Sequence, residues 1–242
     1  MKTNFLFSSL SRGEKLLWLS SCAMILGSAL LAGGSGPACV FASLIGVTAL
    51  IFVAKGYVAG QILTVVFALV YGVISFFYRY YGEMITYLGM TAPIALLTAV
   101  TWLRHPFEGS REVEICRVNR VQIKRMLLCA LPVTAAFFLI LRALGNASLT
   151  ISTISIATSF FAAWLSFLRS PYYALAYAAN DLVLIVLWSL ASAEDLSCLS
   201  MVICFAMFLL NDLYGFVNWQ RMLQRQMLMQ SFPEQQQSNN LI

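Results

Sequence analysis

The chain has 242 residues, of which 60% are hydrophobic and only 10% charged, and its mean hydropathy is +0.81. Charged residues normally approach a quarter of a soluble domain, so this composition excludes a water-soluble globule and predicts an all-α, polytopic membrane helix bundle. The net charge of +5 comes from basic residues that lie between apolar runs, a distribution that orients membrane helices, so nucleic acid is excluded as a partner.

Eight apolar runs are each long enough, or nearly so, to cross a bilayer as a helix. They cover residues 16–31, 39–54, 58–78, 84–103, 126–141, 151–168, 172–190 and 197–219. The first run ends at the breaker cluster 33–37, which fits the end of either a helix or a signal peptide. A retained span is favoured, since no clean Ala-x-Ala cleavage site appears, and a cleavable signal peptide is the alternative. With a cytoplasmic N-terminus, all 15 Lys and Arg residues except Arg79 and Arg142 lie on the cytoplasmic side, which predicts that both termini are cytoplasmic.

The long connection 104–125 separates two halves of similar layout. In each half a span ends at a lone basic hinge residue, Lys55 or Arg169, and the third span ends in tryptophan, Trp102 or Trp219. Because one linker span lies between them, the two three-span units point the same way across the membrane. The predicted segments are a tail with an extra span (1–34), a first three-helix repeat (38–103), a cytoplasmic loop with a linker helix (104–145), a second repeat (148–220) and a polar cytoplasmic tail (221–242).

Asp181 and Asp212 are the most informative residues, because each lies within an apolar run and follows an asparagine. A charged side chain at the centre of a spanning helix costs at least about 2.5 kcal/mol and persists mainly beside a polar cavity or a partner. Polar and aromatic residues recur on the same helix faces, which predicts a wet central cavity for a neutral or cationic molecule with hydroxyls and a flat ring. The alternative is that the asparagines and tyrosines only bridge helices by hydrogen bonds.

Other patterns carry less. Small and hydroxyl residues at 152, 155, 159, 162 and 166 predict a close-packing seam, and Trp102 and Trp219 are either interfacial anchors or part of the site. The six scattered cysteines and the single His105 predict neither metal site nor disulfides, and no cofactor is expected. The chain has no hydrolase or nucleotide-binding motif, so it is predicted not to be an enzyme; an aspartyl hydrolase using the two aspartates is a minor alternative.

Several short motifs resemble the PnuC family of bacterial vitamin transporters. They are Ala54-Lys55-Gly56, Tyr80-Tyr81-Gly82-Glu83-Met84, the Arg169 hinge with Asn180 eleven residues later, and LNDLYGFVNW at 210–219. The resemblance covers roughly 44–219, and the last motif is the most specific. In this family, the span that carries the Asn180 position often begins with a Trp-x-x-Trp pair. This chain has Tyr173 and Ala176 there, so the resemblance does not fix which ring the substrate carries.

The resemblance implies a three-plus-one-plus-three fold like that of SWEET sugar carriers, a homotrimer, and location in the bacterial inner membrane among lipids. It also implies uptake of nicotinamide riboside by facilitated diffusion, with trapping by a cytoplasmic kinase. Thiamine or a deoxynucleoside is the alternative substrate, and a proton-coupled carrier or a non-transporting scaffold is the alternative function. The resemblance implies substrate binding by Tyr173, Asn180, Asn211, Tyr214 and Asn218, to which helix facing and polarity add Gln61, Tyr177, Asp181, Trp188 and Asp212.

Overall fold

The computed structural model describes residues 6–31, 37–77, 81–146, 148–194, 196 and 199–231, and its regular elements there are helices. A π-helical turn, η2 (Tyr87–Thr91), joins α4 to α5, and two short 3-10 helices, η1 (Leu6–Ser9) and η3 (Phe107–Gly109), lie outside the long helices. The α-helices are α1 (Arg12–Leu31), α2 (Pro37–Ala54), α3 (Val58–Phe77), α4 (Tyr81–Thr86), α5 (Ala92–Arg104), α6 (Arg120–Ala143), α7 (Leu149–Phe167), α8 (Tyr173–Glu194) and α9 (Leu199–Ser231).

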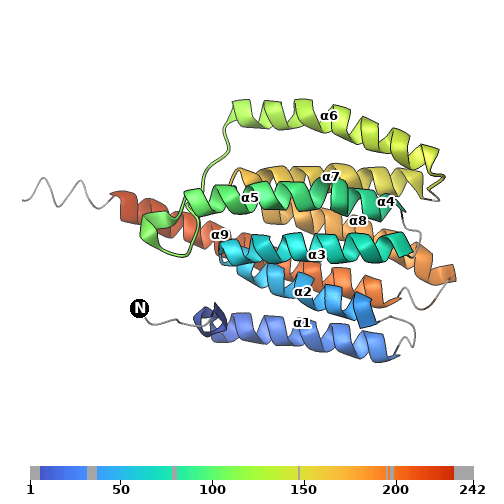
Figure 1. The fold of residues 1–242 in the computed structure, drawn as a ribbon. Helices are drawn as coiled ribbons and strands as arrows, with labels where there is room; N and C mark the ends of the chain where they lie inside the picture. Colours follow the sequence, from blue (N-terminus) through green and yellow to red (C-terminus); the bar gives the residue numbers. More distant parts are fainter. Residues whose placement is uncertain are drawn as a thin grey trace, which may run out of the picture.

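All eight predicted runs form helices, which confirms the all-α fold class. Within the described residues, seven segments are long and apolar enough to cross a membrane: α2, α3, the continuous segment Tyr81–Arg104, α6, α7, α8 and α9. α1 is not among them, because Arg12, Glu14 and Lys15 make its first turn polar. It is nevertheless as long as α3, at 20 residues, and lies alongside the bundle (Figure 1).

Six helices form a closed ring in which each packs against the next, in the order α2, α3, α5, α7, α8, α9 and back to α2. α1 packs outside this ring on α2 and α9, and α6 packs outside it on α7 (Figure 1). The first three helices of the ring come from the predicted first repeat and the last three from the second. The inner face of the ring therefore combines residues from both halves of the chain.

The two hinges that follow α2 and α7 have the same backbone geometry. Gly56, with φ of +67°, donates its N–H to the Val53 carbonyl at 2.8 Å. Arg169, with φ of +58°, donates its N–H to the Ser166 carbonyl at 3.0 Å. A left-handed residue is a usual helix stop, and it costs more for arginine than for glycine. The matching turns support the proposal that the two halves are repeats.

The loop between α5 and α6 connects these hinges at one end of the bundle, here called the linker end. Val113 N–H donates to the Gly56 carbonyl at 2.9 Å, and Cys116 N–H donates to the Arg169 carbonyl at 3.0 Å. Glu114 also pairs with the Arg169 guanidinium at 3.3 Å. The loop is therefore an ordered strap across both halves rather than a free connection.

The first eleven residues of the predicted polar tail from 221 continue α9, which extends to Ser231. Figure 1 shows this extension reaching beyond the ring at the linker end. Gln226 is buried there and forms two hydrogen bonds with the strap. It accepts from Ile115 N–H at 2.9 Å and donates to the Val113 carbonyl at 3.1 Å. Met222 and Leu223 pack in the same cluster, so tertiary contacts stabilise a segment that its polar composition did not predict to be helical. Residues 232–242 lie outside the described chain.

Glu14 attaches α1 to the ring, and it is buried although it is an acid. Its carboxylate accepts from the Ser11 backbone N–H at 2.6 Å in a capping arrangement, from Tyr214 Oη at 2.8 Å and from Lys55 Nζ at 3.2 Å. Trp18 on α1 also donates to Thr48 on α2 at 3.0 Å. These bonds join the start of α1 to α2, α9 and the first hinge.

Replacing Glu14 with alanine is expected to destabilise the protein by about 3 to 5 kcal/mol, because it leaves a half-buried Lys55 ammonium without its partner. Thermal unfolding in detergent, followed by size-exclusion chromatography, measures the effect. The control is Arg225→Ala, which breaks the more exposed pair with Glu112 and is expected to cost about 1 kcal/mol or less. Equal melting shifts for the two variants would contradict this role of Glu14.

Candidate functional site

Asp181 on α8 and Asp212 on α9 meet where these two helices pack together. Each residue is only 4% exposed, and their carboxyl groups are hydrogen-bonded to one another. A hydrogen bond between two carboxyl groups requires a proton on one of them. Among the described residues, the acids that form salt bridges are Glu14, Glu112 and Glu114. Neither Asp181 nor Asp212 forms one there.

Two acceptor atoms in this region are buried without a hydrogen-bond donor. They are Asp181 Oδ2 and Asn211 Oδ1. An unpaired buried polar group costs roughly 1 to 3 kcal/mol in proteins, so such atoms mark places where a ligand or water supplies the missing donor. Both belong to the α8–α9 pair, which makes it the best-supported part of the predicted site.

A tyrosine from each half of the chain lies near the carboxyl pair. Tyr177 on α8 interacts electrostatically with Asp181 and Asp212, and Tyr87 does so with Asp181. Tyr87 opens the π-helical turn that precedes Pro93 in α5, and such turns often occur at functional sites. Its ring lies 4.6 Å from that of Tyr71 on α3, in an edge-to-face arrangement. Tyrosine rings from both halves of the chain therefore lie near the carboxyls.

The two asparagines point away from each other. Asn180 Oδ1 faces α7, where it accepts from hydroxyls of Ser155 at 3.2 Å, Thr158 at 2.8 Å and Ser159 at 3.0 Å. Asn211 Nδ2 instead donates to Ser21 Oγ of α1 at 3.0 Å. Two residues of the predicted α7 seam, Ser155 and Ser159, thus contact α8. Of the two Asn-Asp pairs, the structure brings together the aspartates and separates the asparagines.

Three further predicted residues join pairs of helices by hydrogen bonds. Gln61 Nε2 on α3 donates to Ser166 Oγ on α7 at 3.1 Å. Tyr214 bonds Glu14, and Asn218 Nδ2 donates to the Ala54 carbonyl at the end of α2 at 2.8 Å. The face of α9 that carries Asn211, Tyr214 and Asn218 is thus bonded to α1 and α2. Their substrate-binding role stays a prediction.

Two aromatic residues of α8 occupy opposite parts of the helix. Tyr173 is 1% exposed, and its ring lies edge-to-face on Trp219 at 4.6 Å. Trp188 packs in a different cluster with Tyr71, Leu184 and Phe208. Tyr177 packs with Tyr173 in the cluster at the hinge level, and both interact electrostatically with Asp212, whereas Trp188 lies in the other cluster.

The sequence predicts Tyr71, on a polar stripe with Gln61, and Tyr87, near Pro93, as residues that line the cavity, without placing either in the substrate site. The departure from α geometry at Tyr87 agrees with the bend expected near an intrahelical proline. Ser21 and Glu14 were missed, because their partners are on α9 and the sequence shows no link between them.

A cavity of about 250 Å³ opens elsewhere, at the linker end between α3, α5 and the strap. None of the predicted site residues lines it. Its lining residues are Tyr57, Val58, Ala59, Trp102, Leu103, Pro106, Ser110, Arg111 and Glu112. The cavity is therefore separate from the carboxyl pair.

The comparisons with known proteins decide the family. The family model described as "Nicotinamide mononucleotide transporter" matches residues 37–221. The chain belongs to the PnuC family of transporters. Among its PnuC relatives is the nicotinamide riboside transporter PnuC of Neisseria mucosa, which is 24% identical over 189 residues, covering 76% of this chain and 72% of the relative.

The fold is also that of a solved PnuC structure. The structure titled "Crystal structure of the Vitamin B3 transporter PnuC" has a TM-score of 0.77 and 22% identity, and covers 91% of this chain and 96% of its own. The predicted PnuC resemblance is thereby confirmed, and the chain is a multi-pass membrane transporter. The range matched by the PnuC family model begins at the start of α2 and ends two residues past Trp219, so α1 lies outside it.

Proposed function

We propose that this protein transports nicotinamide riboside across the inner membrane of a bacterium. The observation that carries the proposal is the buried site of α8 and α9, which has two carboxyls, two acceptors without donors and flanking tyrosines within a PnuC-type ring. Ribose hydroxyls and a carboxamide supply the missing donors, and the tyrosine rings supply flat surfaces for the ring of the substrate. The relative named as a nicotinamide riboside transporter supports the choice of substrate.

Transport proceeds by rocking of the two halves about this site, so that it opens alternately to each side. The ring supports this proposal because α2–α9 and α5–α7 are the contacts at which the halves meet, and the strap ties both hinges at the linker end. Facilitated diffusion with trapping by a cytoplasmic kinase requires no nucleotide-binding domain in this chain.

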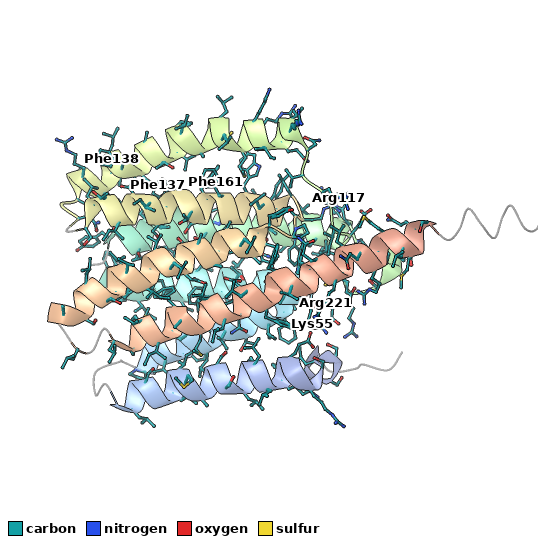
Figure 2. The ribbon with its side chains drawn as sticks, turned by 180° about the vertical axis from the view of Figure 1, so that it is seen from behind. Lys55, Arg117, Phe137, Phe138, Phe161 and Arg221 are labelled. Carbon is teal, nitrogen blue, oxygen red and sulfur yellow. The ribbon has the colours of Figure 1, made fainter. Side chains whose placement is uncertain are left out.

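The linker end is proposed to face the cytoplasm. α1 begins and α9 ends at this end of the bundle (Figure 1), and Lys55, Arg117 and Arg221 lie there together (Figure 2). Basic residues concentrate on the cytoplasmic side of membrane proteins, which supports this orientation. A homotrimer belongs to the same proposal, and native mass spectrometry of the detergent-purified protein tests it.

Binding of nicotinamide riboside to the purified protein, measured by isothermal titration calorimetry, tests the substrate and the site together. Tyr177→Ala is expected to weaken binding about tenfold or more, because stacking on one aromatic side chain contributes roughly 1 to 3 kcal/mol. Tyr177→Phe keeps the ring and is the matched control, expected to bind within about threefold of the parent. Unchanged affinity in Tyr177→Ala would remove this residue from the site.

A proton-coupled carrier is the second candidate, favoured by the proton that the Asp181–Asp212 hydrogen bond requires. Uptake of radiolabelled nicotinamide riboside into proteoliposomes, with and without an imposed proton gradient, separates the two. Facilitated diffusion predicts equal initial rates. Thiamine and deoxynucleosides in the same assay decide between the alternative substrates.

A further inference from the structure

The carboxyl pair is unusual because two acids contact one another inside an apolar bundle. Asp181 and Asp212 are each 4% exposed, and they interact electrostatically with each other, with tyrosines and, in the case of Asp181, with Cys204. A pair that shares one proton carries one negative charge, and an isolated charge costs several kcal/mol when it is buried. The basic residues Lys55 and Arg169 are engaged at the hinges by Glu14 and Glu114.

The surroundings of the pair favour a cation. Asp181 Oδ2 is buried without an N–H or hydroxyl donor, so apart from Asp212 nothing in the described structure supplies it with a hydrogen bond. Tyr177 and Tyr87 lie close enough to interact with Asp181, and the faces of aromatic rings attract positive charge. A buried pair of carboxyls that holds a shared proton, an oxygen without an N–H or hydroxyl donor, and tyrosine rings together match a flat aromatic ring that carries a positive charge.

We propose that Asp181 and Asp212 act together as the counter-ion for a positively charged aromatic ring and thereby select cationic substrates over neutral ones of the same shape. This inference rests on the proposed function, since the pyridine ring of nicotinamide riboside is N-glycosylated and carries a permanent positive charge. The thiazolium ring of thiamine is also cationic, whereas deoxynucleosides are neutral. The carboxyl pair therefore sets the substrate class, and the flanking rings and amides set the shape.

The experiment compares two ligands that differ mainly in ring charge. Nicotinamide riboside and its uncharged 1,4-dihydro form are titrated into the detergent-purified parent protein and into the double variant Asp181→Asn/Asp212→Asn, which keeps the side-chain shapes. The double variant is expected to lose at least thirtyfold in affinity for the cation and to change less than threefold for the dihydro form. Glu108→Gln, in the exposed loop, is the control and is expected to bind both ligands as the parent does.

Loss of affinity by equal factors for both ligands, or no loss for either, overturns the counter-ion role. If the double variant does not fold, Asp181→Asn alone and the charge-retaining Asp212→Glu are titrated with the same two ligands. The proposal is supported if Asp181→Asn loses affinity for the cation only and Asp212→Glu still prefers the cation. Any other pattern overturns it. If the parent binds no nicotinamide riboside, the proposed function fails, and the inference is then decided with thiamine and deoxyadenosine. Thiamine binding that the double variant loses upholds it, whereas deoxyadenosine binding in preference to thiamine overturns it.

Discussion

Trp219→Ala is expected to destabilise the protein by about 3 to 5 kcal/mol, the range for removing a fully buried large aromatic side chain. Trp219 has 0% exposure, and its ring contacts those of Tyr173 at 4.6 Å and Trp102 at 5.3 Å. Its Nε1 also donates to the Val53 carbonyl at 2.9 Å, which joins α9 to the end of α2. The substitution therefore removes packing between the two halves of the chain and one hydrogen bond at the first hinge.

Melting in detergent, followed by size-exclusion chromatography, measures the loss. Trp219→Phe keeps most of the ring and loses the hydrogen bond, so it is expected to cost about 0.5 to 1.5 kcal/mol. Leu128→Ala is the control, because Leu128 on α6 is 73% exposed, and it is expected to change the melting temperature little. A melting shift for Trp219→Ala no larger than that of the control would contradict the structural role.

Substitution of Trp102 provides an internal check on the result expected for Trp219. Its Nε1 donates to the Ser166 carbonyl at 3.1 Å, which joins α5 to the end of α7 just as Trp219 joins α9 to α2. Trp102→Ala is expected to have an effect of similar size. Because the two rings are in contact, the double variant is expected to lose less than the sum of the single losses. Strict additivity would show that the two tryptophans do not form one unit.

Gly60→Ala is the second change with a large expected effect, and its cause is steric. A Cβ at Gly60 lies 2.4 Å from the Val53 backbone nitrogen and 2.8 Å from the Phe52 carbonyl carbon. Backbone atoms at a helix crossing do not move as a side chain does, so α2 and α3 have to separate, which costs several kcal/mol by overpacking. The expected result is a strongly lowered melting temperature or loss of the monodisperse chromatographic peak.

Gly27→Ala in α1 is the matched control, because beyond its chain neighbours and its own helix backbone no atom lies within 4 Å of the added Cβ. Alanine is the better helix former by roughly 1 kcal/mol, so this variant is expected to melt at the same temperature or higher. If Gly60→Ala behaves like Gly27→Ala, the close approach of α2 and α3 is not the reason for glycine at position 60.

The positions of the helices were predictable because apolar length is a local property. The runs 39–54 and 58–78 correspond closely to α2 and α3, and each hinge lies where a basic residue interrupts the apolar sequence. The extension of α9 to Ser231 was not predictable, because its stability comes from Gln226 clasping the strap rather than from its own residues. The burial of Trp102 and Trp219 was not predictable for the same reason, because it depends on tertiary contacts. The sequence allowed both as interfacial anchors, and the structure buries them.

The candidate site shows the same division between local and long-range information. That Asp181 and Asp212 need a polar partner follows from the cost of an acid in an apolar helix, and this was argued from the sequence. That each finds the other, while Asn180 faces α7 and Asn211 faces α1, depends on how α8 and α9 are rotated about their axes. Adjacent residues on a helix point about 100° apart, so each Asn-Asp pair serves two different neighbours.

The sequence by itself determined that this chain crosses a membrane repeatedly, that its halves share a layout and that two acids require a polar setting, since hydropathy and charge act residue by residue. Only the tertiary structure decided that the two acids meet beside tyrosines from both halves, that the tryptophans are internal and that Glu14 attaches α1 to the ring. The physical reason is that these contacts join residues far apart in the chain, and helix packing alone sets which side chains face one another.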